Sequence, residues 1–568
     1  MVKRNIHLLL AVLLISILAY SGTLSNGFVF DDNFQLLQNR WITDPSSIKK
    51  IFFSSVWDFE GHGGSIAYNS YRPLIHVAYI SVYRFFGLDP AAYHALNVIL
   101  HALNSALVFI TASLLLSRAP GAASRPYAAY LPFFAATIFV LHPAGAEAVS
   151  WVACVTELLY TLFFLLSFLA FIGTDKARAP LLSAAFFFVA LLSKETALAL
   201  PVVIWAYDRC GERGVSNRAG ALVRYGPFAV AIVIYLLLRA YSLGGMAPGQ
   251  SKHAYLNAYQ VLLNVPLLMA GYMRFLVIPS DLTVFHVFAP VFGLNDLRLL
   301  VSVAVLAAMA FIFVKTFRSD KRMFFSLTLM VAPLLPVMYI PGIGRNPFAE
   351  RYMYLPVVGF ALSLLYLSDR LLGKAAMRRA WSAFALLATT VVAVYAFVVV
   401  TRIPEWRDDG TLWRSAIEQD PANYYAMNEL AGLLLERKAY DEAADIAGRS
   451  VEINSLRPAQ DARILGRAHF TIATALRLNG VKDGKADTGS IEGALFHYNE
   501  ALKVFKAKND LKAVYNDLGA FQMTLGRSDD AVKSFEAALL AVPDDNILLR
   551  NLQIARKAAV SRVAKGPR

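Results

Sequence analysis

Two adjacent carboxylates, Asp31 and Asp32, follow directly after the first apolar stretch and end the run Asn26-Gly27-Phe28-Val29-Phe30-Asp31-Asp32. A carboxylate in this position could act as a general base that takes the proton from an acceptor hydroxyl. The alternative is structural, because Asp-Asp-Asn is also a good turn and helix-capping sequence. Base catalysis would need a second element, a cationic site for a leaving group such as phosphate.

Four cations fit that second element. The expected topology places Arg72, Lys194, Arg345 and Arg351 at the same membrane face as the carboxylate pair. Arginine suits phosphate because its planar fork donates paired hydrogen bonds. Carboxylates and cations that converge on one membrane face fit a reaction in which phosphate leaves a lipid-borne substrate.

Two histidines and a glutamate are further candidates for substrate contacts. His94 begins a span, and His142 and Glu147 bracket a short turn between two others. A histidine at a span end is also an ordinary interfacial anchor. The spacing of these residues matches no metal motif, so no metal ligand set is predicted. A divalent cation held by aspartate and phosphate oxygens stays open as a cofactor.

Charged residues at the starts of two other apolar stretches complete the candidate set. Glu195 follows Lys194, and Glu350, Arg351 and Tyr352 begin a later span. The alternative for the second group is a snorkelling arginine beside an aromatic belt, with Glu350 and Arg351 paired to each other. We predict substrate or phosphate binding for both groups.

Composition places the chain among membrane proteins. It has 568 residues, of which 57% are hydrophobic and 17% charged. Many windows of about 20 residues carry almost no charge, which is the length that crosses the hydrocarbon core. The formal net charge of +14 does not indicate nucleic-acid binding, because most Lys and Arg residues lie in short loops between spans.

The apolar stretches predict a polytopic helix bundle of about eleven spans. The first, at about 7–24, is interpreted as an uncleaved span with a cytoplasmic N-terminus, which places residues 25–93 in a catalytic outer loop. Later spans are expected at about 95–116, 128–141, 149–172, 227–243, 298–314, 323–340, 352–367 and 380–400.

Two stretches admit more than one topology. Residues 181–207 form either a hairpin of two short helices with Ser193-Lys194-Glu195 at its outer tip, or one long helix with a buried charged pair. A charged pair within a span is expensive and usually functional. Residues 257–278 form either a re-entrant or interfacial pair of helices broken at Pro266, or an ordinary span.

A repeat begins where the apolar stretches end. Trp413 and Ala416 recur as Ala447 and Ser450, a spacing of 34 (447 − 413 and 450 − 416). The last unit shows the small and aromatic residues of the tetratricopeptide pattern most clearly: Leu518, Gly519, Gly526, Ala531, Phe535, Ala538 and Pro543. We therefore predict an all-α chain with a membrane domain at 1–402 and an extracytoplasmic tetratricopeptide-repeat α-solenoid at 403–568.

The ordered set of motifs resembles a known family. Phe-Val-Phe-Asp31-Asp32, Tyr71-Arg72-Pro73-Leu74, His94-x-x-Asn97-x-x-x-His101, His142-Pro143-x-x-x-Glu147, Ser193-Lys194-Glu195 and Glu350-Arg351-Tyr352 occur in this order, followed by the repeats. In this it is similar to the transmembrane and tetratricopeptide-repeat-containing O-mannosyltransferases and their bacterial relatives, within the glycosyltransferase C superfamily. The similarity covers nearly the whole chain.

The resemblance implies a polyprenyl-phosphate monosaccharide donor and inverting transfer at the extracytoplasmic face. It implies catalysis by Asp31 or Asp32, and phosphate binding by Arg351 or Lys194 with Arg72 in support. The repeats would present a polypeptide acceptor. One departure concerns the arginine expected shortly before Glu157, where this chain has Val155-Thr156. The resemblance therefore does not fix mannose as the donor sugar.

Three other functions compete with protein glycosylation. The sugar could go to lipid A, another envelope glycan or a lipid carrier. The chain could instead be a membrane-anchored repeat scaffold, although an anchor needs only one span. A transporter would need polar residues and broken helices at the membrane midplane. The absence of an Asn-x-Ser/Thr sequon favours a bacterial envelope, so we expect a multi-pass inner-membrane protein.

Overall fold

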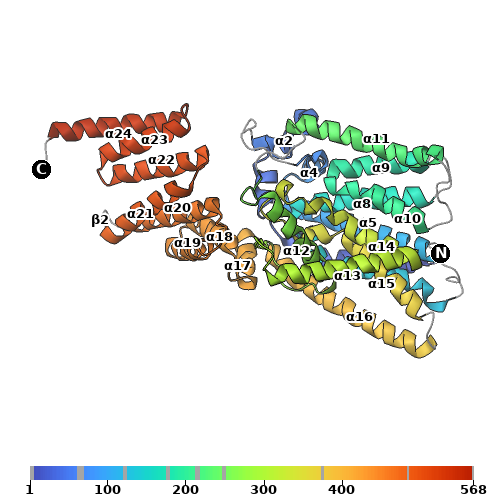
Figure 1. Cartoon of the computed structure of the whole chain (residues 1–568). Coiled ribbons are helices and arrows are strands. Elements are labelled where there is room, and N and C mark those ends of the chain that lie inside the picture. Colours follow the sequence, from blue (N-terminus) through green and yellow to red (C-terminus); the bar gives the residue numbers. More distant parts are fainter. Residues whose placement is uncertain are drawn as a thin grey trace. The chain divides into compact units, whose positions relative to one another are not determined.

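The chain folds into two compact helical units, Met1–Leu412 and Trp413–Arg568, in a computed structural model. The structure describes residues 5–60, 70–118, 125–173, 179–210, 218–245, 251–372, 377–482 and 485–565. Figure 1 shows both units built almost entirely from helices. The unit boundary falls ten residues after the expected domain limit at 402, because residues 403–412 pack with the first unit.

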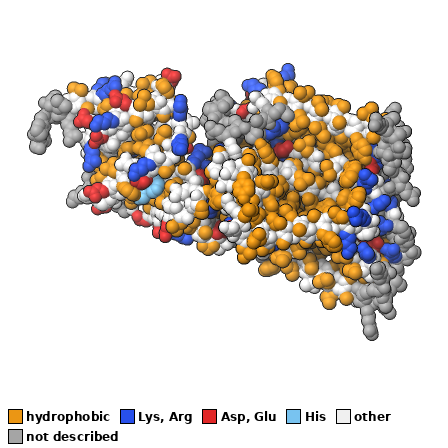
Figure 2. Space-filling model, in the orientation of Figure 1, with side chains coloured by type: hydrophobic (Ala, Val, Ile, Leu, Met, Phe, Trp, Pro, Cys, Tyr) orange, Lys and Arg blue, Asp and Glu red, His pale blue; other side chains and the backbone are white. Residues whose placement is uncertain are grey.

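The first unit is a bundle of apolar helices. Its longer helices are α1 (Ile6–Tyr20), α4 (Pro73–Phe86), α5 (Pro90–Ser117), α6 (Leu131–Leu141), α8 (Val155–Gly173), α9 (Ala179–Ser193), α10 (Leu200–Cys210), α11 (Arg218–Leu243), α12 (Ala258–Val277), α13 (Leu297–Ser319), α14 (Lys321–Val331), α15 (Pro356–Leu372) and α16 (Met377–Arg402). Hydrophobic side chains cover much of the visible surface of this unit (Figure 2). Such an apolar exterior is the surface that a bilayer solvates.

The expected number of about eleven spans exceeds what helix length supports. Within the described residues, eight helices are long and apolar enough to cross a membrane, or nine if the bent pair Tyr127–Leu141 and Pro143–Ser150 is one span. The bend of 52° follows the proline that ends α6. The span expected at 149–172 is also interrupted, because α7 (Ala146–Ser150) and a 3-10 turn precede α8.

Residues 181–207 form the predicted hairpin. α9 ends at Ser193, and α10 returns after the short 3-10 helix Glu195–Ala199. Arg118 donates to the hydroxyl of Tyr207 in α10 and, over 2.7 Å, to the carbonyl of Ile172 in α8. α10 therefore ends beside the end of α8, which excludes one long helix. α9 itself lies between α8 and α11 (Figure 1).

Of the two alternatives for residues 257–278, the pair of helices broken at Pro266 is excluded, because α12 runs continuously through that proline. Both ends of α12 nevertheless meet the same region. His253, just before the helix, contacts the carbonyl of Gly344 over 2.8 Å, and Tyr272 near its end donates to the carbonyl of Pro347 over 2.8 Å. α12 thus runs alongside the loop at 341–350. This loop lies at the end of the bundle that carries the cavity described below. We call this end the site face.

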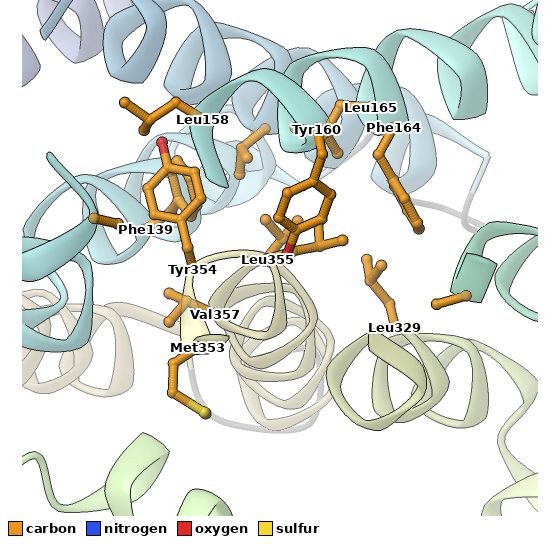
Figure 3. Packing of buried hydrophobic residues seen from close by; sticks show 14 of the residues in the cluster. Phe139, Leu158, Tyr160, Phe164, Leu165, Leu329, Met353, Tyr354, Leu355 and Val357 are labelled. Atoms are coloured by element: carbon orange, nitrogen blue, oxygen red, sulfur yellow. The ribbon is translucent and has the colours of Figure 1, made fainter. Parts of the chain in front are cut away.

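Tight packing of aromatic residues fixes the centre of the bundle. Tyr354 lies against the ring of Phe139 at 5.2 Å and donates or accepts a 2.7 Å hydrogen bond with His101 Nδ1. Figure 3 shows Tyr354 and Leu355 beside Leu158 and Tyr160 of α8. The segment that begins at Glu350 is therefore anchored directly on α8.

The second unit is the predicted helical repeat. Its helices are α17 (Asp409–Gln419, which begins in the first unit), α18 (Tyr424–Glu436), α19 (Tyr440–Ser455), α20 (Ala462–Asn479), α21 (Thr488–Val504), α22 (Lys508–Thr524), α23 (Ser528–Ala541) and α24 (Asn546–Lys565). Successive helices pack against each other. A Cβ on Gly466 or Gly519 would lie 2.8 Å from a ring atom of Phe505 or Phe535, which explains the small residues at these crossings. Two-residue strands, Val481–Lys482 and Lys485–Ala486, form a small hairpin between α20 and α21.

Candidate functional site

A polar cavity of about 210 Å³ opens at the site face of the first unit. Six charged side chains line it: Asp31, Arg72, Glu157, Lys194, Glu195 and Arg351. They come from the first loop, from α8, from the α9–α10 connection and from the segment before α15. Charged groups from such distant segments converge in an otherwise apolar bundle, which marks the cavity as the candidate functional site.

The two adjacent aspartates have different environments. Asp31 lines the cavity. Asp32 is fully buried, and its two carboxylate oxygens accept hydrogen bonds from the backbone N–H of Val29 at 3.2 Å and of Ala153 at 2.8 Å. Burial raises the pKa of Asp32 well above its usual range, against the opposing effect of these two donors. Asp32 is not among the residues that line the cavity, and its two hydrogen bonds tie the first loop to the start of α8.

Arg72 and Glu195 form a two-pronged ion pair in the cavity wall. Nε and Nη2 of Arg72 donate to the two oxygens of Glu195 over 3.1 and 2.5 Å. Although burial opposes ionisation, Arg72 lowers the pKa of Glu195 to about 2. The pair therefore stays ionised at neutral pH. Arg72 keeps further N–H groups with which it can donate to a ligand.

Lys194 pairs with a residue that the sequence did not single out as a contact. Its ammonium group donates to Oε1 of Glu157, and both side chains are only 2% exposed. The ammonium also lies 4.5 Å from the ring centre of Tyr352, a cation–π contact. Lys194 and Glu195, neighbours in sequence, thus have separate partners, Glu157 in α8 and Arg72 just before α4.

Arg351 pairs with Glu147 and not with its neighbour Glu350. The Arg351 backbone N–H donates to Glu147 Oε2 over 2.8 Å and its Nη1 donates to Oε1 over 2.5 Å. Glu350 is fully buried and accepts two hydrogen bonds from Arg402, at 2.6 and 3.3 Å. The alternative in which Glu350 and Arg351 pair with each other is therefore excluded. Each residue has a partner on a different helix because consecutive side chains of a 3-10 turn point in different directions.

Five residues predicted to contact substrate are not among those that line the cavity: His94, His142, Glu147, Arg345 and Glu350. His94 donates from Nε2 to the carbonyl of Gly27 over 3.2 Å, and His142 donates from Nε2 to the carbonyl of Leu276 over 3.0 Å. Both histidines therefore hold backbone in place. Glu147 acts through Arg351, with which it forms the ion pair.

A row of buried polar residues on α5 supports the cavity from behind. Asn97 donates from Nδ2 to the carbonyls of Val149 and Trp151 over 3.3 and 2.9 Å. Asn104 donates from Nδ2 to the carbonyl of Leu158 over 3.0 Å. The Asn97 bonds satisfy carbonyls of the irregular segment before α8, and the Asn104 bond fastens the first turn of α8 itself. The motif His94-x-x-Asn97-x-x-x-His101 is thus a scaffold in this structure.

Two buried polar atoms on residues of the cavity wall have no hydrogen-bond partner among the described residues, Oε2 of Glu157 and Nε1 of Trp151. The first is an acceptor and the second a donor, the two functions that a sugar hydroxyl can satisfy. Glu157 could have been found from sequence, because it is the one acidic residue in an apolar stretch of span length. No comparable signal marks Trp151.

The described residues contain no group of three or more His, Cys, Asp or Glu side chains that could hold a metal ion. The charges of the cavity instead come as three ion pairs, Arg72–Glu195, Lys194–Glu157 and Arg351–Glu147, with Asp31 in addition. Paired cations are held rigidly and still have donors left, so the arrangement can orient an anionic group beside a carboxylate.

Three relatives of the chain carry the same description. The chain is 23% identical over 473 residues to protein O-mannosyl-transferase TMTC3 of Mus musculus, which covers 76% of this chain and 50% of that protein. It is 24% identical over 440 residues to protein O-mannosyl-transferase F38B6.6 of Caenorhabditis elegans, and 25% identical over 468 residues to TMTC4 of Mus musculus.

These two matches cover 76% and 73% of this chain, and 61% and 62% of the relatives. The chain thus spans between half and two thirds of the length of these three relatives. No family model and no solved structure matches the sequence. The resemblance drawn from the ordered motifs is confirmed, and the chain is a homologue of the TMTC proteins that are named protein O-mannosyl-transferases.

Proposed function

We propose that the chain transfers a monosaccharide from a polyprenyl-phosphate donor to a hydroxyl group of a protein. The observation that carries the proposal is the cavity in which Asp31 lies among three paired cations, Arg72, Lys194 and Arg351. The names of the homologous proteins support sugar transfer to protein. The donor class and the catalytic roles are inferred from the chemistry of the cavity.

Asp31 is the general base in this mechanism. It takes the proton of the acceptor hydroxyl while the hydroxyl oxygen bonds to the anomeric carbon of the sugar. The bond from that carbon to the phosphate oxygen breaks at the same time, and the phosphate leaves with the electron pair. The configuration at the anomeric carbon is therefore inverted, and no covalent enzyme intermediate is needed.

The three cations stabilise the departing phosphate. Each already has one carboxylate partner, which fixes its position before substrate binds. An arginine has five N–H donors and a lysine three, so donors remain for the phosphate oxygens. Oε2 of Glu157 and Nε1 of Trp151 contact sugar hydroxyls in this proposal.

We further propose that the site face is extracytoplasmic and that the protein lies in a bacterial inner membrane with its repeats outside the cytoplasm. Lys and Arg side chains gather toward one end of the first unit in Figure 2. Basic residues also lie where helix ends meet, since Arg209 of α10 contacts the ring of Phe317 in α13 and Arg370 of α15 donates to Asp320. A basic end is the cytoplasmic end under the positive-inside rule. Labelling of single cysteines placed at either end of α13 in intact cells tests this orientation.

The decisive experiment compares wild type with Asp31→Asn in membranes supplied with radiolabelled polyprenyl-phosphate sugars and envelope extract. We expect label on protein for wild type and a loss of about 100-fold or more for Asp31→Asn. Asp89→Asn is the matched control, because Asp89 lies in the same loop and caps α5 through Ala91 N–H. Equal transfer by wild type and Asp31→Asn would remove Asp31 from the mechanism, and label on lipid alone would make the acceptor a glycolipid.

A further inference from the structure

Asp409, the first residue of α17, contacts the turn that presents Asp31. Its Oδ1 accepts a 2.7 Å hydrogen bond from the backbone N–H of Phe30, and its Oδ2 accepts a 2.8 Å bond from Nδ2 of Asn33. The two contacts flank Asp31 in sequence, one on each side. A single carboxylate therefore holds both ends of the segment that carries the proposed base.

The turn needs such support because its backbone is strained. Phe30 has a φ of +53°, in the left-handed region that residues with a side chain rarely adopt. A strained residue persists only where its surroundings over-determine its conformation. Asp409 takes the Phe30 N–H, and the Phe30 ring stacks on Trp151 of the cavity wall with 5.5 Å between centroids.

Neighbouring bonds show that the contact is part of a built interface within the first unit. The Gly27 N–H donates to the carbonyl of Arg407 over 2.9 Å, and Asn26 donates from Nδ2 to the carbonyl of Ile403 over 3.1 Å. The first loop is thus fastened along the segment 403–409, which follows the last membrane helix α16. Asp409 supplies the charged acceptor in this set of four bonds, and the other two acceptors are backbone carbonyls.

We propose that Asp409 is a positioning residue for Asp31, an inference that rests on the function proposed above. Its carboxylate fixes the Phe30–Asn33 turn so that Asp31 faces the cavity at the distance the acceptor hydroxyl needs. Asp409 does not line the cavity and contacts no reacting atom. Its loss therefore slows the chemical step and leaves donor binding intact.

An exchange of the two partner side chains tests the proposal. In Asp409→Asn one of the two acceptor oxygens becomes an NH2 group, so the charge-assisted bonds to the Phe30 N–H and to the Asn33 amide are weakened and the turn loosens. In Asn33→Asp two carboxylates face each other. The double variant Asn33→Asp with Asp409→Asn restores one carboxylate and one amide. Asp408→Asn is the control, because Asp408 is adjacent, carries the same charge and caps the Thr411 N–H of its own helix.

For the transfer reaction we expect Asp409→Asn to lower kcat by about 10- to 100-fold with KM for the donor changed less than threefold. The double variant should recover most of the lost kcat, and Asp408→Asn should behave as wild type. An unchanged kcat in Asp409→Asn, or a double variant no better than Asn33→Asp alone, would overturn the proposal.

Hydrogen–deuterium exchange of the full-length variants gives a readout that needs no turnover. Asp409→Asn should speed exchange in peptides that cover residues 26–37, and the double variant should slow it again. The same exchange in Asp409→Asn and wild type would overturn the positioning role even if the protein proved inactive. Inactive wild type with the expected exchange pattern would instead reject the proposed function and keep the structural role of Asp409.

Discussion

At the scale of single residues, the cavity depends on which charged group meets which partner. Asp31 lines the cavity, whereas Asp32, the next residue, accepts hydrogen bonds from two backbone N–H groups. The sequence placed both in the first outer loop and could not choose between them, because the choice depends on the Ala153 N–H far along the chain. The same limit left the partners of Glu350 and Arg351 open, since both partners lie on distant helices.

Removal of one member of the Lys194–Glu157 pair should unfold the site. Lys194→Met leaves the Glu157 carboxyl without its cation in a place where it is only 2% exposed. We expect a stability loss of about 3–5 kcal/mol, as for other buried pairs that lose one partner. Unfolding in mixed micelles, followed by tryptophan fluorescence, measures the change.

Replacement of both members, Lys194→Met with Glu157→Met, separates folding from function. A well-packed apolar pair of similar volume restores most of the stability. Transfer activity should stay lost, because the cation and the proposed sugar contact are both gone. A double variant as unstable as Lys194→Met would contradict this account of the pair.

At the scale of elements, close helix crossings decide how the cavity wall is held. Much of this level follows from sequence: apolar runs predict the bundle helices, and small residues at period 34 predict the repeat pairs. The broken course of residues 143–154 did not follow, because its backbone bonds are satisfied by side chains of α5 such as Asn97. For residues 257–278 the sequence left a continuous and a broken helix open, since a proline does not always interrupt a helix within a membrane bundle.

Gly359 sets the approach of α15 to α14. A Cβ at this position would lie 2.3 Å from the backbone N of Met330, so Gly359→Ala must push the two helices apart. We expect a loss of several kcal/mol, larger than ordinary overpacking of about 1–3 kcal/mol, because backbone cannot rotate away. The midpoint of thermal unfolding in detergent measures this effect.

Gly432→Ala provides the contrast, because a methyl group added to Gly432 on α18 would meet no neighbouring atom within 4 Å among the described residues. Here alanine should stabilise the helix by about 0.5–1 kcal/mol through its better helix propensity. Similar losses in both variants would mean that the tight crossing at Gly359 does not govern stability.

A histidine pair makes the repeat helices sensitive to acid. Nδ1 of His469 on α20 lies 2.9 Å from Nδ1 of His497 on α21, so one ring must donate and the other accept. Burial, aided by the neighbouring His497, lowers the pKa of His469 to about 4. The unfolded chain, with a pKa of about 6.5, then binds more protons than the folded chain between these values.

Stability from this pair is therefore full above about pH 6.5 and is lost as pH falls toward 4. Hydrogen–deuterium exchange of peptides in α20 and α21, corrected for intrinsic rates, should show faster opening at pH 5 than at pH 7. In His469→Gln with His497→Gln this difference should shrink, because no imidazole remains to be protonated. An unaltered pH response in the double variant would assign it to other groups.

At the scale of the whole molecule, the first loop and the segment after the last membrane helix act as one body. The sequence Asp408-Asp409 is typical of an ordinary exposed helix start. No local pattern links Asp409 to Asp31. A domain limit at residue 402, where the apolar stretches end, therefore separates Asp409 from the first loop that it contacts. The period of the repeats predicts the second unit well, whereas the contacts of Asp409 with the first loop need the three-dimensional structure.

Two truncated chains test whether the segment 403–419 holds the first loop in place. A chain that ends after Gln419 keeps α17 and should retain slow exchange in residues 26–37, whereas a chain that ends after Arg402 loses Asp409 and should exchange rapidly there. Both lack the repeats, so each controls for their removal. Equal protection in the two truncated chains would show that the segment 403–419 does not hold the loop.

The bond between Asn33 and Asp409 can form only late in the synthesis of the chain. The two residues are 376 positions apart in the chain. At ribosomal rates of about 5–20 residues per second, Asp409 is made roughly 20–75 s after Asn33. During that interval the first loop has already left the ribosome without the hydrogen bonds from Asp409. A nascent chain that has not yet reached Asp409 therefore cannot hold the Phe30–Asn33 turn as the complete first unit does.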